Sequence, residues 1–248
     1  MHILVTNDDG VNAPGLQALV EVMNKFGRVT VIAPEQNRSG VSSAISLEMP
    51  IRVTEKAPNW YQLNGTPADC VKLALSGFLN EEPSIVVSGI NAGANLGDDV
   101  IYSGTVAAAI EGRFLGLPSL AFSCTGKGNF HFETAAKVAT DVMRQLIRHR
   151  LRSGLILTIN IPNVPLSELK GMKVTRQGDR EFSEPLKPTV DGHGRPIYWL
   201  GEVGRPKDDS DGTDFHAVHS GYASITPMQV DMTAHREINT VQKWLESK

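Results

Sequence analysis

Two adjacent carboxylates, Asp8 and Asp9, follow a short apolar run at the start of the chain and precede Gly10. Successive side chains of a regular strand point to opposite faces, so both can serve one site only if the chain turns there, which Gly10 permits. Two close carboxylates also repel each other unless a cation lies between them. The pair therefore indicates either a solvated Asx-Gly turn or the anionic half of a metal site.

More polar side chains follow two later apolar runs. The polar loop after the second run contains Asn37 and Ser39, and a Gly- and Asn-rich loop after a third run contains Asn91 and Asn95. Ligands of open parallel sheets bind beyond the carboxyl ends of the strands, so these side chains and the two carboxylates should share one edge. Carboxylate, hydroxyl and amide oxygens select Mg²⁺, Mn²⁺ or Ca²⁺ over zinc. The pattern predicts a divalent-cation site with positions left for water.

A site of this kind suits a phosphate substrate, and Ser103, Gly104 and Thr105 supply a second phosphate-binding element. They open an alanine-rich helix, residues 106–114, whose start presents backbone amides and two hydroxyl groups to an anion. The alternative is a simple N-cap, in which Ser103 or Thr105 satisfies the first helical amides. The two roles are compatible, because amides that the cap leaves free can still bind phosphate.

Other polar residues have structural explanations. Thr66-Pro67-Ala68-Asp69 has the form of a capping box, so we expect Asp69 to cap a helix that runs to about residue 79. His216 and His219 lack further ligands at zinc-binding spacing. Turns, caps or solvated charges are expected at Asp98, Asp99, His131, Asp208, Asp209, Asp211 and Asp214. The sequence contains no Walker A, GxGxxG or GxSxG motif.

Strands that alternate with helices must position these loops. Buried strands are predicted at residues 2–6, 29–33, 84–88, 119–123 and 155–160, with a short extended piece at 61–64. Helical spacing of apolar residues occurs at 14–26, 66–79, 106–114 and 132–149. The alternation predicts an α/β fold with a parallel sheet covered on both faces.

The texture of the sequence changes after residue 162. Residues 163–230 contain more Pro, Gly and charge and no long helical pattern, and a final helix is predicted at 234–245. Short extended pieces at 172–176, 197–200 and 222–225 predict hairpins or an arm, and residues 46–53 a strand or an arm. We therefore divide the chain into a core, residues 1–162, and an arm region, 163–248, expected to pack against a partner subunit.

The composition excludes several classes of protein. The 248-residue chain is 41% hydrophobic and 21% charged, as is usual for globular proteins. A net charge of −3 and a pI of about 6.2 argue against binding to nucleic acid or to a membrane surface. No window approaches a transmembrane span. Cys70 and Cys124 are far apart in the sequence and indicate two reduced thiols in a cytoplasmic protein.

Five segments of the chain carry a family resemblance: ILVTNDDGVNAPGLQAL, PEQNRSGVSSAISL, NGTPADCVKLAL, VVSGINAGANLGDDVIYSGTVAAAIEG and GTDFHAVHSGYASITPMQVDMT. The motifs NDDG, NRSG, SGINAG and YSGT are highly specific together in this order. Through them the chain resembles the SurE (survival protein E) family of metal-dependent 5′/3′-nucleotidases with acid-phosphatase character. The segments span residues 3–233, which is nearly the whole chain.

The resemblance implies a Rossmann-like, three-layer core with a mostly parallel sheet, and a C-terminal arm that forms a homodimer or tetramer. It implies hydrolysis of nucleoside 5′- and 3′-monophosphates, and of polyphosphate in some members. One divalent ion per subunit, Mg²⁺ or Mn²⁺ (Ca²⁺ in a crystal), would be held by Asp8, Asp9, Ser39 and Asn91. The substrate phosphate is expected to contact Asn37, Gly40, Asn95, Ser103, Gly104 and Thr105.

Asp8 and Asp9 are the expected catalytic residues. They would act in the attack of a metal-activated water on phosphorus, one of them taking the proton of that water. A covalent aspartyl-phosphate is the rival mechanism. Two further classes stay open: a nucleotide sensor that binds without turnover, and a structural oligomer whose Asp-rich turn holds calcium.

Overall fold

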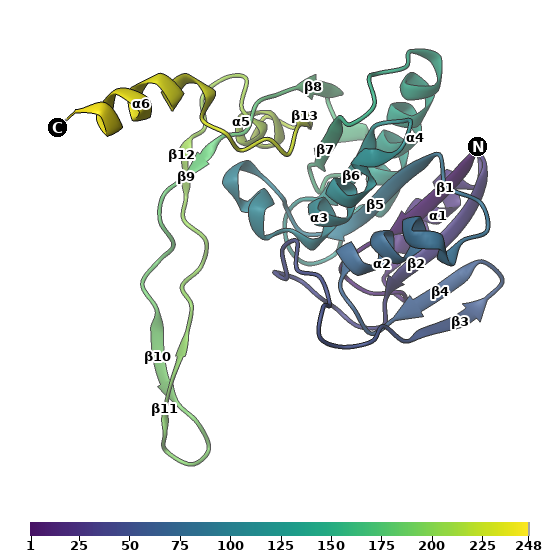
Figure 1. Cartoon of the computed structure of the whole chain (residues 1–248), viewed down its shortest axis with the longest axis horizontal. Coiled ribbons are helices and arrows are strands. Elements are labelled where there is room, and N and C mark those ends of the chain that lie inside the picture. Colours follow the sequence, from purple (N-terminus) through teal and green to yellow (C-terminus); the bar gives the residue numbers. More distant parts are fainter. Residues whose placement is uncertain (248) are drawn as a thin grey trace.

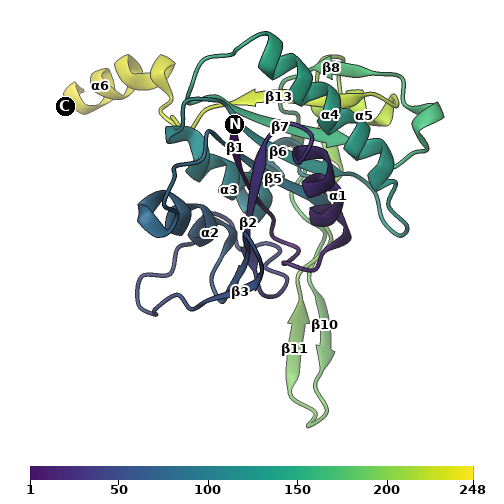
Figure 2. The ribbon, with the colours of Figure 1, turned by 90° about the vertical axis from the view of Figure 1, so that its right-hand side faces the viewer.

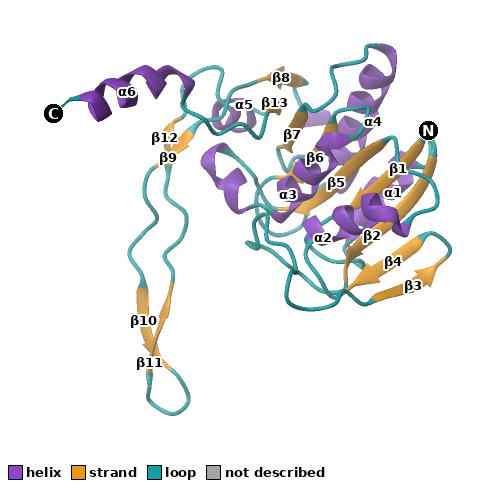
Figure 3. Ribbon diagram, viewed as in Figure 1, coloured by secondary structure: helices purple, strands orange, loops and turns teal. Residues whose placement is uncertain are grey.

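A nine-stranded sheet runs through the protein, which we describe from a computed structural model over residues 1–247 (Figures 1 and 3). In spatial order its strands are β3 (Val53–Ala57), β4 (Trp60–Leu63), β2 (Arg28–Pro34), β1 (His2–Thr6), β5 (Ile85–Ala92), β6 (Ser119–Cys124), β7 (Ile156–Ile161), β13 (Ala223–Met228) and β8 (Met172–Val174). The strands from β4 to β7 are parallel to one another. At the edges, β3 is antiparallel to β4 and β13 is antiparallel to β7.

Helices cover both faces of the sheet, as Figure 2 shows. On one side lie α1 (Pro14–Met23) and α4 (Phe132–Arg148), and on the other lie α2 (Pro67–Leu73) and α3 (Gly104–Glu111). The alternation of side chains along β1 explains this: Ile3 and Val5 pack with α1 and α4, whereas Leu4 packs with α2 and α3. The predicted three-layer α/β fold with a mostly parallel sheet is confirmed.

The bounds of several predicted segments need correction. The α-helix expected to run to about residue 79 ends at Leu73 and is followed by a short π-helical stretch with non-helical backbone at Ser76 and Gly77. Strand β5 continues to Ala92, past its expected end at residue 88, because its pairing with β6 resumes at Asn91 after a register shift. Gly89 lies in this irregular stretch with a φ of +124°, and a Cβ atom there would come within 2.3 Å of the Phe122 carbonyl oxygen. Residues 46–52 form no strand, and β3 begins only at Val53.

Part of the C-terminal segment adds strands to the sheet, and another part forms a hairpin outside it. Strands β13 and β8 extend the sheet beyond β7, so the sheet does not end at residue 162. A long hairpin projects away from the core (Figure 1), with β9 (Asp179–Arg180) and β12 (Pro206–Asp208) at its root and β10 (Lys187–Val190) and β11 (Pro196–Trp199) farther out. We call residues 179–208 the arm.

Two more helices follow the arm. Helix α5 (Asp214–His219) packs beside β13 near the root of the arm, and α6 (Ile238–Glu246) projects from the body of the protein at the C-terminal end (Figure 1). None of the helices described here combines the length and the apolar character needed to cross a membrane.

Candidate active site

The carboxyl ends of β1, β2 and β5 meet at one edge of the sheet, as their parallel pairing requires. Two hydrogen bonds join the segments that follow these strands. The amide of Arg38 donates to the carbonyl oxygen of Asp8 at 2.8 Å, and the amide of Ala92 donates to Oδ2 of Asp9 at 2.9 Å. The loops after β1, β2 and β5 are therefore in contact, as predicted.

A cleft of about 560 Å³ opens at this edge. Six of the ten residues predicted for the site line it: Asp8, Ser39, Gly40, Asn91, Asn95 and Ser103. The other four lie directly behind this lining or beside it: Asp9, Asn37, Gly104 and Thr105. The residues proposed from the sequence thus lie together at a single cleft.

Asp8 is buried at the base of the cleft and is held by the start of α3. The Thr105 hydroxyl donates to Oδ1 of Asp8 at 2.5 Å. Gly104 leaves room for this carboxylate, because a Cβ atom at that position would lie 2.8 Å from the Asp8 Cβ. Burial raises the pKa of Asp8 to about 6; the Thr105 hydrogen bond opposes the shift and the charge of Asp9 adds to it.

The turn that separates Asp8 from Asp9 is built locally. The Asn7 side-chain amide donates to the Gly10 carbonyl at 2.9 Å, and Gly10 has a φ of +103°. Asp9 is half-buried, and burial raises its pKa while the bond from the Ala92 amide lowers it. The chain therefore leaves the strand and turns at the residue predicted to allow it.

Ser39 and Asn91 each keep an oxygen available. Oδ1 of Asn37 accepts from the Ser39 amide at 2.7 Å and from the Ser39 hydroxyl at 2.6 Å, so the lone pairs of that hydroxyl are not used by the bond. The Asn91 side-chain nitrogen donates to the Gly93 carbonyl at 3.0 Å, which leaves the side-chain oxygen for another partner. Asn37 thus positions Ser39 from outside the lining of the cleft.

The oxygen atoms available at the cleft are suitable ligands for a hard divalent cation. Two carboxylates, one hydroxyl and one amide oxygen form an all-oxygen set of the kind that Mg²⁺ and Mn²⁺ prefer. Within residues 1–247 no group of three or more His, Cys, Asp or Glu side chains could hold a metal. A cation at Asp8 and Asp9 would therefore need the neutral oxygens of Ser39 and Asn91, with water for its remaining positions.

The start of α3 combines a cap with a free amide. The Ser103 hydroxyl accepts from the Val106 amide at 3.1 Å, so Ser103 is the N-cap, as the structural alternative proposed. The Gly104 amide makes no hydrogen bond within the described chain. The N-terminus of α3 consequently keeps a donor for an anion at the cleft.

Asn95 lines the cleft but is also tied into the core. Its backbone amide donates to Oδ1 of Asn160 at 2.8 Å, and its side-chain nitrogen donates to the Ser123 hydroxyl at 2.8 Å. The Asn160 side chain donates back to the Asn95 carbonyl at 2.8 Å. These bonds anchor the loop after β5 to β6 and β7.

Several residues at the cleft were not predicted from the sequence. They include Asp99, Tyr102, Lys127, Arg180 and Val203. Asp99 had been expected in a cap or turn, but its carboxylate pairs with Nε of Arg180 at 2.5 Å. Burial raises the pKa of Asp99, and the Arg180 guanidinium opposes that shift. No local signal could reveal this pair, since 81 residues separate its members.

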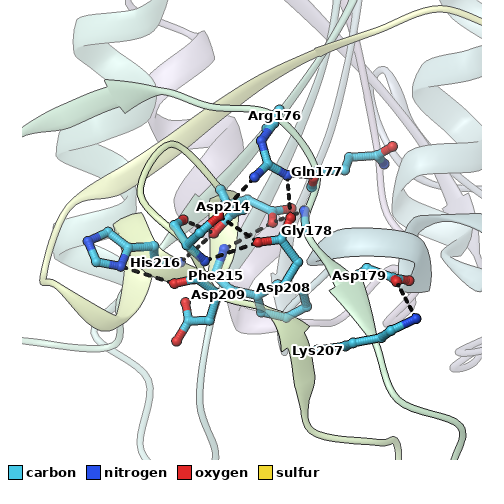
Figure 4. A network of polar contacts seen from close by, with 12 residues as sticks. Arg176, Gln177, Gly178, Asp179, Lys207, Asp208, Asp209, Asp214, Phe215 and His216 are labelled. Atoms are coloured by element: carbon cyan, nitrogen blue, oxygen red, sulfur yellow. Dashed lines mark hydrogen bonds and ion pairs between the residues drawn. The ribbon is translucent and has the colours of Figure 1, made fainter.

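Figure 4 shows the polar network beside this pair, at the root of the arm. Asp214 is buried and accepts from the backbone amides of Gly97 at 2.7 Å and Gly178 at 2.8 Å. Asp208 pairs with Arg176 at 2.6 Å, and this partner holds the pKa of Asp208 well below its usual range. The expected turn is present at residues 211–212, but Asp214 itself is buried at the start of α5, and Asp208 is paired with Arg176 instead of being only solvated; both carboxylates join segments distant in sequence.

The remaining discounted residues have structural roles. Asp69 forms the predicted capping box with Thr66 and also accepts from the Ser46 amide at 2.9 Å. His219 contacts the Asp209 carboxylate at 3.1 Å, and His131, at the start of α4, contacts Glu133 at 2.6 Å. These contacts fit the sequence reading that none of these side chains belongs to the site.

Comparisons with known proteins agree with one another. The chain matches the family model described as Survival protein SurE over residues 3–184. A protein of Alkalilimnicola ehrlichii named 5′-nucleotidase SurE is 52% identical over 245 residues, which cover 99% of this chain and 95% of that protein. A protein of the same name from Actinobacillus succinogenes is 50% identical over the full length of both. The crystal structure of the SurE protein from Aquifex aeolicus superposes with a TM-score of 0.86, at 41% identity and over all of both chains.

Proposed function

The chain belongs to the SurE family, and from this we infer that it is a 5′-nucleotidase, which hydrolyses nucleoside 5′-monophosphates to nucleoside and phosphate. The cleft at the edge of the sheet is the observation that supports a location for this activity. There Asp8, Ser39 and Asn91 face one space with the start of α3. We propose this cleft as the active site, with 3′-monophosphates and short polyphosphate as further substrates.

We assign one Mg²⁺ or Mn²⁺ ion to the oxygens of Asp8, Asp9, Ser39 and Asn91. When bound, the ion supplies positive charge to the phosphate and lowers the pKa of an attacking water. The protein keeps the two carboxylates in place, since Thr105 holds Asp8 and the Ala92 amide holds Asp9. A carboxylate oxygen of this pair takes the proton of the water.

We propose that the substrate phosphate lies at the N-terminus of α3. The free Gly104 amide and the helix dipole favour an anion there. Gly40 has a φ of +75° and open space at its Cβ position, so its backbone can approach a phosphate oxygen. Asn95 completes the binding surface, with Ser103 and Thr105 supporting it and Asn37 orienting Ser39.

Phosphate release from nucleoside monophosphates, measured with and without Mn²⁺ or Mg²⁺, tests this function. We expect turnover only with the ion, and its loss by orders of magnitude in Asp8→Asn and Asp9→Asn at unchanged far-UV circular dichroism. Tight nucleotide binding without phosphate release would instead support a sensor. A chelator that lowers the Tm of a protein without phosphatase activity would support a structural calcium site. Labelled phosphate trapped on either aspartate would replace water attack with the covalent mechanism.

We also propose that the protein forms a homodimer or tetramer through its C-terminal region. The arm carries large exposed apolar side chains, with Phe182 95% and Leu200 91% exposed. Helix α6 adds an exposed apolar stripe: Ile238, Val241, Trp244 and Leu245. Apolar surface this extensive on projecting elements is typical of an interaction site.

A cytoplasmic location is a further proposal. Cys70 and Cys124 are free and buried, and burial raises the pKa of Cys124 to about 12. Thiols held protonated and away from solvent are inert. This state supports the expectation of a protein that works in a reducing compartment.

A further inference from the structure

We propose that the outer part of the active-site cleft is a nucleoside-binding subsite, in which the ring of Tyr102 stacks on the base and the root of the arm forms a second wall. The inference rests on the proposed nucleotidase function and adds the residues that recognise the nucleoside. It concerns specificity, because none of these residues belongs to the set assigned to the ion or the phosphate.

Tyr102 is placed next to the phosphate-binding element. It is the last residue of the 3₁₀ helix η2 (Gly97–Tyr102) and precedes Ser103, the N-cap of α3. Its side chain lines the same cleft as Asp8 and Ser39. In a nucleoside monophosphate only the ribose separates the phosphate from the base, so a base platform must lie within about one side-chain length of the phosphate site.

The backbone of Tyr102 is fixed while its ring is uncovered. The Ser42 amide donates to the Tyr102 carbonyl at 3.1 Å, and the Ser42 hydroxyl donates to the Ile101 carbonyl at 2.5 Å. The Tyr102 side chain makes no hydrogen bond and no aromatic contact with residues 1–247, and the residue is 63% exposed. An aromatic side chain on a fixed backbone has only two rotatable bonds, so it loses little conformational entropy when a base stacks on it.

Arg180 ties the arm to this element. Its Nε bonds Asp99, which lies in η2 with Tyr102, and its Nη1 donates to the Gly204 carbonyl at 2.8 Å. The guanidinium carbon also lies 4.7 Å from the centroid of the Phe215 ring. Arg180 is therefore a positioning residue that keeps η2 and both strands of the arm root in register.

The chemistry of the outer cleft suits a nucleoside. Tyr102 offers an aromatic face, Val203 offers exposed apolar surface from the returning segment of the arm, and Lys127 offers a cation from the loop after β6. Every base has a π face that can stack on an aromatic side chain. Inorganic phosphate and polyphosphate have no group that would use an aromatic wall, so the subsite predicts a preference for nucleotides.

The test compares adenosine 5′-monophosphate with ribose 5-phosphate, which has an anomeric hydroxyl in place of the base, both with Mn²⁺. Tyr102→Ala should lower kcat/KM for the nucleotide about tenfold, the scale of one stacked base, and leave kcat/KM for ribose 5-phosphate unchanged. Tyr102→Phe keeps the ring and should behave as wild type. Tyr198→Ala is the matched control, because Tyr198 is 62% exposed but lies in β11, on the far part of the arm.

Three results would overturn the subsite. Tyr102→Ala could lower both substrates equally, leave the nucleotide unaffected, or act only by changing the oligomeric mass measured by light scattering. The first result would place Tyr102 in phosphate binding, and the last would make it an interface residue. Failure of the underlying function looks different: wild-type protein would then release phosphate from neither substrate, and both proposals would fall together.

Discussion

At the candidate site, burial has its clearest effect on the pKa of Asp8. Asp8 is 4% exposed, and the Thr105 hydroxyl and the nearby Asp9 are its polar surroundings. Removing a carboxylate from water disfavours its charged form, and the hydrogen bonds from the Thr105 hydroxyl and from the backbone of Asp8 and Thr105 do not offset that cost. A divalent cation bound by the two acids, as proposed, would offset this cost.

The raised pKa of Asp8 predicts how the stability of the ion-free protein depends on pH. Its pKa is about 6 in the folded protein, against an ordinary value of 3.8 for an exposed aspartate. The folded state therefore binds the proton more tightly, and the resulting stabilisation is present below about pH 4 and is lost as the pH rises to about 6. A shift of this size corresponds to roughly 3 kcal/mol.

Urea unfolding of chelator-treated protein between pH 4 and pH 7 measures this effect. Wild type should lose free energy of unfolding across the window relative to Asp8→Asn, whose side chain does not titrate. Parallel pH profiles for the two proteins would show that Asp8 is not desolvated in the folded state.

At the scale of elements, the site depends on where strands end and on what holds their loops. Strand β5 places Asn91 at the edge of the sheet only because the strand resumes its pairing with β6 after a register shift. The 3₁₀ helix η2 then carries the chain from this edge to α3 and is held by two residues from beyond residue 175. Asp214 binds its first amide, at Gly97, and Arg180 pairs with Asp99 in its middle.

Loss of the Arg180 contact should therefore weaken substrate binding more than turnover. In Arg180→Ala the ion pair with Asp99 is gone and η2 is released from the arm, while the residues assigned to the ion and the phosphate remain. We expect KM for adenosine 5′-monophosphate to rise up to about tenfold, equivalent to one lost charge-assisted hydrogen bond, with kcat little changed. Steady-state kinetics at saturating Mn²⁺ measure both constants.

Arg195→Ala is a suitable control for this variant. Arg195 also pairs through Nε with an aspartate, Asp191, at 2.7 Å, but it lies at the far end of the arm. Arg180→Lys keeps the charge without the planar fork and should recover only part of the wild-type KM. Equal effects of Arg180→Ala and Arg195→Ala would refute the positioning role.

At the scale of the whole molecule, the arm and α6 project from the body (Figure 1) and carry exposed apolar side chains. If a partner subunit covers them, the mass in solution should be a multiple of 26.9 kDa. Trp244 is 70% exposed and lies on the apolar stripe of α6. Trp244→Glu places a charge in the proposed interface and should shift the protein toward the monomer, as measured by light scattering after size exclusion.

Asn239→Asp controls for the added charge, because helical geometry places Asn239 on the side of α6 away from the apolar stripe. It should keep the wild-type mass. A wild-type protein that is monomeric at micromolar concentration would remove the proposed role of α6 and of the arm in assembly.

Local features of this protein can be predicted from its sequence because neighbours in the chain determine them. The turn after β1 needs only Asn7 and Gly10, and the capping box of α2 needs only Thr66 and Asp69. Apolar periodicity is also a local property, so it predicts the strands of the parallel sheet, and parallel strands bring their carboxyl ends to one edge. The sequence by itself therefore determines the α/β core and the loops that meet at the cleft.

The tertiary structure alone decides which distant residues complete these loops. Thr105 reaches Asp8 across 97 residues, and the Gly97 amide reaches Asp214 across 117. Arg180 carries no local pattern that assigns it to a site, and it lines the cleft only because the root of the arm lies beside η2. Such contacts depend on how the chain folds back on itself in space, which the periodicity of neighbouring residues does not encode.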